Sequence, residues 1–281
     1  MKNRIFNVIC AAFIIGSLGI TGTYVFSDYN LNSLSASAVQ PQTVPQISAS
    51  GAILMDADTR EVLYEKDSNR QLMPASTTKI MTALVALEIC DEIEVSIESE
   101  VIVPADAVGV EGSSIYLKEG ERISIEKLLY GLMLQSGNDA ATALAVCLGG
   151  SEKAFVERMN VTAADIGCEN TNFENPHGLS SENHYTTASD LALIACEAME
   201  RDDFRKIVSA QQWENFYNKN KTVHQYEGGN GIKIGYTKAS GRTLVASAQK
   251  EGQTLIAVVL NDGNWFNDAY SMLDYGFAGK E

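Results

Sequence analysis

The sequence predicts an α/β protein of the α+β type, in which a five-stranded antiparallel sheet is flanked by helices and interrupted by an inserted helical cluster. Short strand-like runs occur near the start of the folded part, at residues 52–55 and 62–64. Three more occur near its end, at 232–237, 243–248 and 254–260. Apolar segments rich in helix formers fill the interval, so the simplest fold joins both groups of strands in one sheet.

The individual elements follow from local patterns. Asp56 to Thr59 supply turn residues between the first two strands, which favours a hairpin. From Ser76 to Leu87 the apolar residues do not alternate strictly with polar ones, which indicates a largely buried helix. Further helices are predicted, in chain order, at residues 125–134, 140–148, 152–166, 188–199 and 264–275.

The N-terminal segment has the composition of an export signal. Lys2 and Arg4 precede an apolar run, and the small residues at 35–38 resemble a signal-peptidase site. Roughly 20 apolar residues can also span a bilayer, so an uncleaved anchor stays open beside a cleaved signal peptide. We expect an exported protein, at the outer face of the cytoplasmic membrane, in the cell wall or outside the cell. The expected parts are a signal or anchor at 1–26, a linker at 27–46 and one folded domain at 47–281.

Composition excludes some classes of partner. Hydrophobic residues make up 45% of the chain, which suits a globular core, whereas a formal net charge of −15 argues against binding nucleic acid. The five cysteines include no C-x-x-C pair, and their spacing suggests no disulfide framework. We expect a monomer that touches the membrane only through its N-terminal segment.

Three short motifs follow one another along the chain. S-x-x-K occurs at Ser76–Lys79, S-x-N at Ser136–Asn138 and K-x-G at Lys233–Gly235. Each motif alone is common, because a serine often caps a helix and a lysine often lies on a surface strand. Their order, their separation and the export segment together predict one catalytic site.

The first motif predicts a nucleophile and its base. Ser76 and Lys79 are three residues apart, so at a helix start their side chains share one face. A serine hydroxyl needs a base, and a desolvated lysine beside other cations can lose its proton near neutral pH. We therefore predict Ser76 as the nucleophile and Lys79 as the general base, with N–H groups at the helix start stabilising an oxyanion.

The second and third motifs supply the remaining groups. Ser136 and Asn138 lie in a break between two apolar helices, where a hydroxyl can relay a proton to the leaving amine and an amide can bind the acyl portion of a peptide. Lys233 begins a strand whose edge can bind an extended peptide, and its ammonium adds positive potential. The backbone N–H of Tyr236, after Gly235, is a candidate second oxyanion donor. This chemistry implies neither a metal nor an organic cofactor.

On these motifs the chain resembles the low-molecular-weight penicillin-binding proteins, which are serine-type D-alanyl-D-alanine carboxypeptidases with a β-lactamase/transpeptidase-like fold. The resemblance implies that peptidoglycan stem peptides acylate Ser76 and lose their terminal D-alanine. It also implies that β-lactams acylate Ser76 as covalent inhibitors. It extends over about residues 48–277 and includes the segments 74–79, 116–121, 175–179, 184–188, 235–237 and 244–248.

Two positions depart from the family pattern. Ile234 stands where the family usually has threonine or serine, whose hydroxyl helps to hold the terminal carboxylate of the substrate. A hydrogen bond to a charged group contributes about 1.5–3 kcal/mol, so we expect weakened carboxypeptidase activity. Many members carry an arginine on the next-but-one strand, where Thr254 stands here, and we expect Arg242 to take over its role. The predicted substrate-binding residues are thus Asn138, Lys233, Ile234, Gly235, Tyr236 and Arg242.

Ile234 keeps one alternative open, a catalytically poor penicillin-binding or wall-sensing module on the same fold. A class A β-lactamase is less favoured, because no Glu-x-x-Leu-Asn pattern lies between the second and third motifs. The sequence lacks G-x-S-x-G and H-E-x-x-H, which disfavours a histidine-based hydrolase, and His177 and His184 are interpreted as structural. Family members often carry a second, β-rich domain, which we do not expect in this chain.

Overall fold

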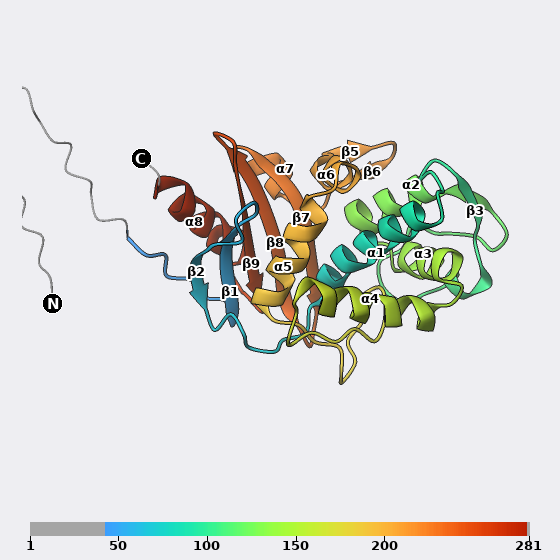
Figure 1. Cartoon of the computed structure of the whole chain (residues 1–281), viewed down its shortest axis with the longest axis horizontal. Coiled ribbons are helices and arrows are strands. Elements are labelled where there is room, and N and C mark those ends of the chain that lie inside the picture. Colours follow the sequence, from blue (N-terminus) through green and yellow to red (C-terminus); the bar gives the residue numbers. More distant parts are fainter. Residues whose placement is uncertain (1–42, 280–281) are drawn as a thin grey trace, which may run out of the picture. The chain divides into compact units, whose positions relative to one another are not determined.

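The computed structural model describes residues 43–279 (Figure 1). The predicted export segment at 1–26 and all but the end of the predicted linker at 27–46 therefore lie outside the described residues. Within the described range, no helix combines the length and the hydropathy that a membrane crossing requires. The four cysteines in this range are free thiols.

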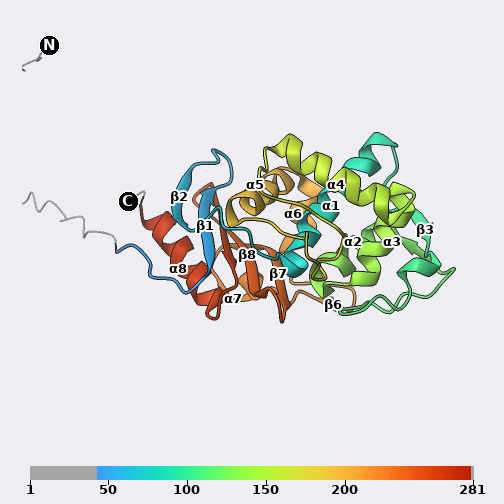
Figure 2. The same ribbon diagram turned by 90° about the horizontal axis from the view of Figure 1, so that it is seen from below.

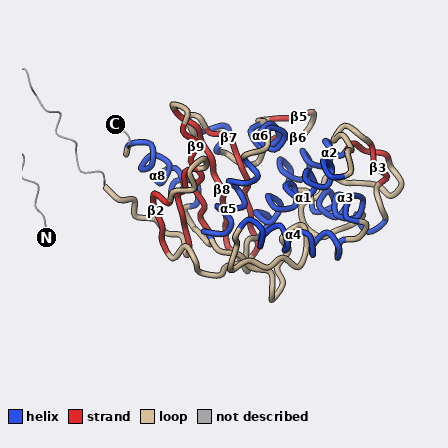
Figure 3. The backbone as a smooth tube through the Cα atoms, viewed as in Figure 1, coloured by secondary structure: helices blue, strands red, loops and turns tan. Residues whose placement is uncertain are grey.

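Five strands form one antiparallel sheet with the spatial order β2-β1-β9-β8-β7, which confirms that the early hairpin joins the three late strands. Figure 3 shows these strands in red beside the helices. β7 lies at one edge, so one side of its backbone is unpaired within the sheet. The strands are β1 (Gly51–Asp56), β2 (Val62–Lys66), β7 (Gly229–Thr237), β8 (Gly241–Lys250) and β9 (Gln253–Leu260).

Helices cover both faces of the sheet (Figures 1 and 2). α8 (Trp265–Ala278) covers one face, called the α8 face below, and α5 (Ala188–Met199) packs on the other. The side chains of β9 alternate between two apolar clusters: Leu255 packs toward α8, whereas Ile256 and Val258 pack on the opposite face. A strand that is buried on both faces has a continuous apolar sequence, as β9 does.

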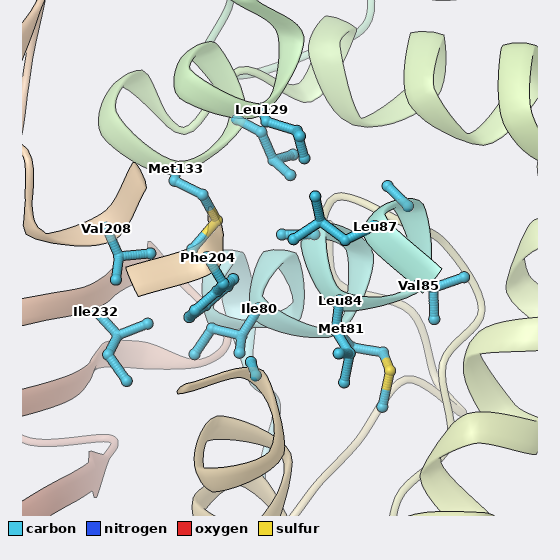
Figure 4. Close-up of a cluster of buried hydrophobic side chains, with 14 of the residues drawn as sticks. Ile80, Met81, Leu84, Val85, Leu87, Leu129, Met133, Phe204, Val208 and Ile232 are labelled. Carbon is cyan, nitrogen blue, oxygen red and sulfur yellow. The ribbon is translucent and has the colours of Figure 1, made fainter. Parts of the chain in front are cut away.

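α1 (Lys79–Glu92) is the central helix of the inserted cluster and is buried on almost all sides. Figure 4 shows Ile80 and Leu84 of α1 in one apolar cluster with Phe204 of a neighbouring helix. This burial explains why the segment has no polar stripe. It also carries the first residue of the helix, Lys79, into the protein interior.

The elements between the two groups of strands are mostly helices, as predicted. Two small antiparallel pairs accompany them, β3 (Glu100–Ile102) with β4 (Arg122–Ser124) and β5 (Gln212–Trp213) with β6 (Phe216–Tyr217). The helices and turns are η2 (Ala75–Thr78), η3 (Ala105–Ala107), α2 (Ile125–Tyr130), η4 (Gly131–Gln135), α3 (Asn138–Gly149), α4 (Glu152–Ile166), α6 (Asp202–Ser209) and α7 (Thr222–Gln225).

The structure refines the predicted helices in two places. The helix expected from Ser76 begins as the 3₁₀ turn η2, and regular α-helix starts at Lys79. The helix expected at 125–134 is α2 followed by η4, a π-helical turn that ends at Gln135. Such turns are frequent at functional sites. α6, α7 and the four strands of the small pairs lie outside the predicted elements.

Replacing Leu84 by alanine should lower the free energy of unfolding by about 2–5 kcal/mol, because the buried side chain would leave a cavity beside α1. Urea unfolding followed by circular dichroism measures the change. Val161→Ala on the exposed side of α4 is the matched control and should change this free energy by less than about 0.5 kcal/mol. Equal effects of the two substitutions would contradict the central place of α1 in the core.

Candidate active site

Ser76 lies in the tight turn η2 at the entry to α1, between buried neighbours. Ala75 is left-handed, with a φ of 50°, a conformation that costs a non-glycine residue about 1–3 kcal/mol. Two hydroxyls hold the turn: Thr77 Oγ1 and Thr243 Oγ1 both donate to the carbonyl oxygen of Pro74, at 2.6 and 3.0 Å. Ser76 itself is half-buried, so the nucleophile is presented on a fixed backbone with part of its surface accessible.

Lys79 is fully buried and joins the first two motifs. Its Nζ donates to Ser76 Oγ at 3.1 Å, to Asn138 Oδ1 at 2.7 Å and to the carbonyl oxygen of His177 at 2.5 Å. An ammonium group has three donors, so each N–H of Lys79 has a partner. The structure thus brings Ser76, Lys79 and Asn138 together around one nitrogen.

The amide of Asn138 is fixed in orientation. Its Nδ2 donates to the carbonyl oxygen of Glu111 at 2.5 Å, which turns Oδ1 toward Lys79. Its backbone N–H donates to the carbonyl oxygen of Ser113 at 2.7 Å. A Cβ on Gly112 would come within 2.7 Å of Nδ2, so glycine leaves the room that this contact needs. One N–H of Nδ2 remains for a peptide substrate.

Asp139, directly after the second motif, holds the neighbouring loop. Its buried carboxylate accepts a hydrogen bond from Ser114 Oγ at 2.6 Å and from the N–H groups of Ile115 and Leu117 at 3.0 and 3.2 Å. Hydrogen bonds to an ionised acceptor are stronger than neutral ones. Asp139 therefore ties the loop at 111–117 to the start of α3.

Ser136 lies between two residues that each contact a lysine. It ends the π-helical turn η4 in a left-handed conformation, with φ 64° and ψ 31°. The preceding carbonyl, that of Gln135, accepts a hydrogen bond from Lys219 Nζ at 2.7 Å. Two residues later, Asn138 binds Lys79. The hydroxyl of Ser136 forms no hydrogen bond with another residue of the described range, so it is free to bind a leaving group.

β7 runs directly past the nucleophile. A Cβ on Gly235 would lie 2.8 Å from the backbone nitrogen of Ser76 and 2.4 Å from Thr243 Oγ1, so glycine permits this close approach of strand and turn. Lys233 points to the same side of the strand and is almost fully buried. Its Nζ donates to the carbonyl oxygen of Ile234 at 3.0 Å. The third motif therefore meets the first at the backbone of Ser76.

Burial and neighbouring cations lower the pKa values of two lysines in the site, Lys79 and Lys233. Burial lowers the pKa of Lys79 well below its ordinary value of 10.5; repulsion by Lys233 adds to the lowering, Asp139 opposes it, and Lys219 makes a smaller addition. Burial and then repulsion by Lys219 lower the pKa of Lys233 to about 7. A buried lysine beside two other cations favours its neutral form, which is the form that can accept a proton.

His177 and His184 support Lys79 and the turn η2. His184 Nδ1 accepts the N–H of Glu174 at 3.0 Å, so its Nε2 carries the proton and donates to Thr78 Oγ1 at 2.9 Å. Burial, with repulsion by Lys79, lowers the pKa of His177 to about 3 and of His184 to about 4. Both rings are therefore neutral at neutral pH. Within residues 43–279, no group of three or more His, Cys, Asp or Glu side chains is placed to hold a metal ion.

This geometry combines a serine nucleophile with a buried lysine base. A family model described as D-alanyl-D-alanine carboxypeptidase matches residues 36–264, a range that contains all three motifs. This chain belongs to that family. The resemblance inferred from the motifs is therefore confirmed, and so is the predicted fold, because solved members share it.

Several carboxypeptidases and related structures are similar to this chain. The D-alanyl-D-alanine carboxypeptidase DacF of Bacillus subtilis is 37% identical over 245 residues, which cover 83% of this chain and 63% of DacF. A mutant of the Streptomyces K15 DD-transpeptidase has a TM-score of 0.79 at 31% identity and covers 84% of this chain and 100% of its own. Penicillin-binding protein 6B of Escherichia coli has a TM-score of 0.79 at 32% identity, covering 84% and 79%. The chain spans 59–64% of the length of three curated relatives that it matches.

Ile234 and Tyr236 lie in and directly after the third motif, on β7. Side chains alternate along a strand, so these two point to the face of the sheet opposite Lys233 and Gly235. Ile234 is half-buried and packs against the apolar cluster of the α8 face. Tyr236 is 64% exposed. Its backbone N–H follows Gly235 on the edge strand, so the backbone of Tyr236 remains the candidate oxyanion donor beside that of Ser76.

The structure does not bring Arg242 to the site, in contrast to the expected role as a carboxylate anchor. Its Nη1 donates to the carbonyl oxygen of Gly263 at 3.3 Å, and its guanidinium lies 5.9 Å from the ring centre of Trp265. The reason is the register of β8: Thr243 points to the nucleophile, so the adjacent residue must point to the α8 face.

Lys219 and Asp139 belong to the site although no motif contains them. Asp139 carries a recognisable signal, because an acid is favourable in the first turn of a helix. Lys219 lies in a segment where Phe216, Asn218 and Asn220 are buried and the intervening residues are exposed. Two of these three buried residues are asparagines, so the alternation of buried and exposed residues is not an alternation of apolar and polar residues. The sequence therefore gives no hydrophobic signal for this segment.

The free energy of unfolding should fall as the pH decreases from about 6.5 toward 4. Folding lowers the pKa of His177 from 6.5 to about 3 and that of His184 from 6.5 to about 4. The unfolded chain therefore binds these protons first, and each histidine contributes up to about 1.4 kcal/mol per pH unit in this window. Urea unfolding over a pH series measures the slope. It should be flatter in the variant His177→Gln/His184→Gln, and an unchanged slope would refute these pKa values.

Proposed function

We propose that this protein removes the terminal D-alanine from peptidoglycan stem peptides through an acyl-enzyme on Ser76. The observation that carries the proposal is the 3.1 Å hydrogen bond between Ser76 Oγ and the buried Nζ of Lys79, a lysine whose pKa is lowered. The similar protein DacF of Bacillus subtilis is named D-alanyl-D-alanine carboxypeptidase, which supports this choice of substrate.

The partners of Lys79 direct its lone pair toward the nucleophile. A neutral lysine amine keeps two N–H donors and gains one lone pair. Asn138 Oδ1 and the carbonyl oxygen of His177 can only accept, so they take the two donors. Ser76 Oγ is the partner that can donate in return. Loss of a proton from Lys79 therefore leaves the Ser76 hydroxyl donating to the amine, the arrangement that a general base requires.

In the proposed reaction, Lys79 takes the proton of Ser76 while Oγ attacks the carbonyl carbon of the penultimate D-alanine. The N–H groups of Ser76 and Tyr236 stabilise the negative oxygen that forms. Ser136 relays the proton that Lys79 took to the leaving amine, so the C–N bond of the peptide breaks, the terminal D-alanine departs and an ester on Ser76 remains. Water then hydrolyses the ester and restores the serine. β-Lactams acylate Ser76 by the same first step.

The proposed substrate binds along the open edge of β7 as an extended peptide, with Asn138 on its acyl portion and the positive charge of Lys233 beside the scissile bond. The predicted export segment would place the protein outside the cytoplasmic membrane, where peptidoglycan peptides occur. We propose that it acts there as a monomer and contacts the membrane only through its N-terminal segment.

Two observations favour a second candidate function, a catalytically poor penicillin-binding or wall-sensing module. Position 234 offers no hydroxyl, and Arg242 lies on the α8 face. A substrate carboxylate that loses one charge-assisted hydrogen bond binds roughly tenfold to a hundredfold more weakly. We therefore include a weakening by Ile234 in the proposal, and this module is its limiting case.

Purified protein incubated with a diacyl-Lys-D-Ala-D-Ala peptide should release D-alanine, which mass spectrometry detects. Ser76→Ala should release none, because the acyl-enzyme cannot form, whereas Ser209→Ala on the exposed side of α6 should behave as the wild type. Labelling with a fluorescent penicillin separates the two candidates. Labelling without release of D-alanine would favour the binding module, and neither labelling nor release would reject both.

The rate of Ser76 acylation should depend on the protonation of both Lys79 and Lys233. Lys79 acts as a neutral amine, so the rate falls as the pH drops below its lowered pKa. Lys233 attracts an anionic ligand only when protonated, so its contribution to the rate falls as the pH rises through about 7. Stopped-flow measurement with a β-lactam gives the profile. The ratio of the wild-type rate to the Lys233→Met rate should fall as the pH rises through about 7, and a ratio that does not change with pH would contradict this charge for Lys233.

A further inference from the structure

The proposed function attracts the C-terminal carboxylate of the departing D-alanine by the charge of Lys233 but assigns it no hydrogen-bond donor. Ile234 has no hydroxyl to offer, and Arg242 is engaged with Gly263 and Trp265 on the α8 face. A carboxylate that leaves water for a partly buried site needs a cationic or hydrogen-bonding partner there. Lys219 is a cation beside this site that the reaction scheme does not use.

Two buried asparagines fix the backbone on either side of Lys219. Asn218 Nδ2 donates to the carbonyl oxygens of Val208 and Ala210, each at 3.0 Å. Asn218 Oδ1 accepts the N–H of Asn220 at 2.9 Å, and Asn220 is only 2% exposed. Both flanking side chains are therefore committed to the protein interior. Lys219 is presented outward from a segment that has little freedom to move.

Lys219 is directed toward the second motif. Its backbone N–H donates to the carbonyl oxygen of Leu134 at 3.3 Å, and its Nζ donates to the carbonyl oxygen of Gln135 at 2.7 Å. The ammonium therefore lies beside Ser136, the next residue in the chain. Asn138, three residues after Gln135, binds Nζ of Lys79, so the contact with Gln135 holds the ammonium of Lys219 near the nucleophile.

The structure of the leaving group ties its carboxylate to Ser136. In D-alanine, the amine and the carboxylate are bonded to the same carbon, so their nitrogen and oxygen atoms lie within about 4 Å of each other. Ser136 is the group that returns a proton to this amine, so the carboxylate must bind close to Ser136. Nζ of Lys219 meets this condition and keeps two N–H donors beyond the one given to Gln135.

We propose that Lys219 binds the C-terminal carboxylate of the substrate and thereby sets a preference for peptides with a free carboxyl end. This inference rests on the proposed function, since it assigns a role within the same site. Lys233 supplies a second positive charge, and within residues 43–279 its buried Nζ has one hydrogen-bond partner, the carbonyl oxygen of Ile234, which leaves two donors of the ammonium. Burial, and then repulsion by Lys219, lower the pKa of Lys233. A carboxylate beside both ammonium groups would offset this repulsion and favour the protonated form of Lys233.

The test compares two substrates that differ only in this carboxylate, diacyl-Lys-D-Ala-D-Ala and its C-terminal amide. For Lys219→Met we expect kcat/KM to fall roughly tenfold to a hundredfold with the free acid and to change little with the amide. Lys219→Arg should keep most of the preference for the acid. Lys221→Met is the matched control, because it removes the same charge two residues away, where Lys221 lies over the ring of Phe266.

Two results would overturn the inference. An equal loss with both substrates would show that Lys219 acts through the potential or the structure of the site and not through the carboxylate. An unchanged kcat/KM with both substrates would show that the carboxylate binds elsewhere.

Binding to a Ser76→Ala protein separates this inference from the proposed function. Isothermal titration calorimetry with the same acid and amide requires no turnover. A preference for the acid that disappears in Ser76→Ala/Lys219→Met supports carboxylate binding even if the wild type releases no D-alanine. Release of D-alanine by the wild type, without any preference for the acid in binding or catalysis, rejects the role of Lys219 and leaves the proposed function intact.

Discussion

The site depends on one buried nitrogen, Nζ of Lys79. A buried ammonium group is costly unless its N–H donors are hydrogen-bonded or it loses its proton. Nζ of Lys79 has an acceptor for each of its three donors, and its pKa is lowered. The three acceptors come from Ser76, Asn138 and His177, which lie far apart in the sequence. The inserted helical cluster and the loops that follow it must therefore fold around this nitrogen before the serine has a base.

The turn that carries Ser76 is packed on two sides by backbone. A Cβ on Gly235 of β7 would meet the nitrogen of Ser76 at 2.8 Å, and a Cβ on Gly178, where φ is +87°, would lie 1.9 Å from the carbonyl oxygen of Ala75. The sheet and the His177 segment thus hold the turn between them. This packing accounts for the left-handed conformation of Ala75, which an isolated turn would not favour.

The sheet and the first motif were predictable because their signals are local. The apolar runs of β8 and β9 specify buried strands, and the three-residue spacing of Ser76 and Lys79 specifies a shared face. Arg242 was not predictable in the same way, since its side of the sheet depends on the register of β8 against β7. Lys219 escaped prediction because the side chains that anchor its segment are polar.

The position of β7 at the edge of the sheet also affects how the protein can aggregate. An unpaired strand is a template on which a second copy of the same chain can add, and proteins limit such aggregation by placing a charge within the exposed strand. Lys233 stands in the middle of β7, with its ammonium turned inward. Lys233 therefore serves both the proposed reaction and the solubility of the protein. An apolar residue at position 233 would make edge-to-edge pairing of two β7 strands more favourable.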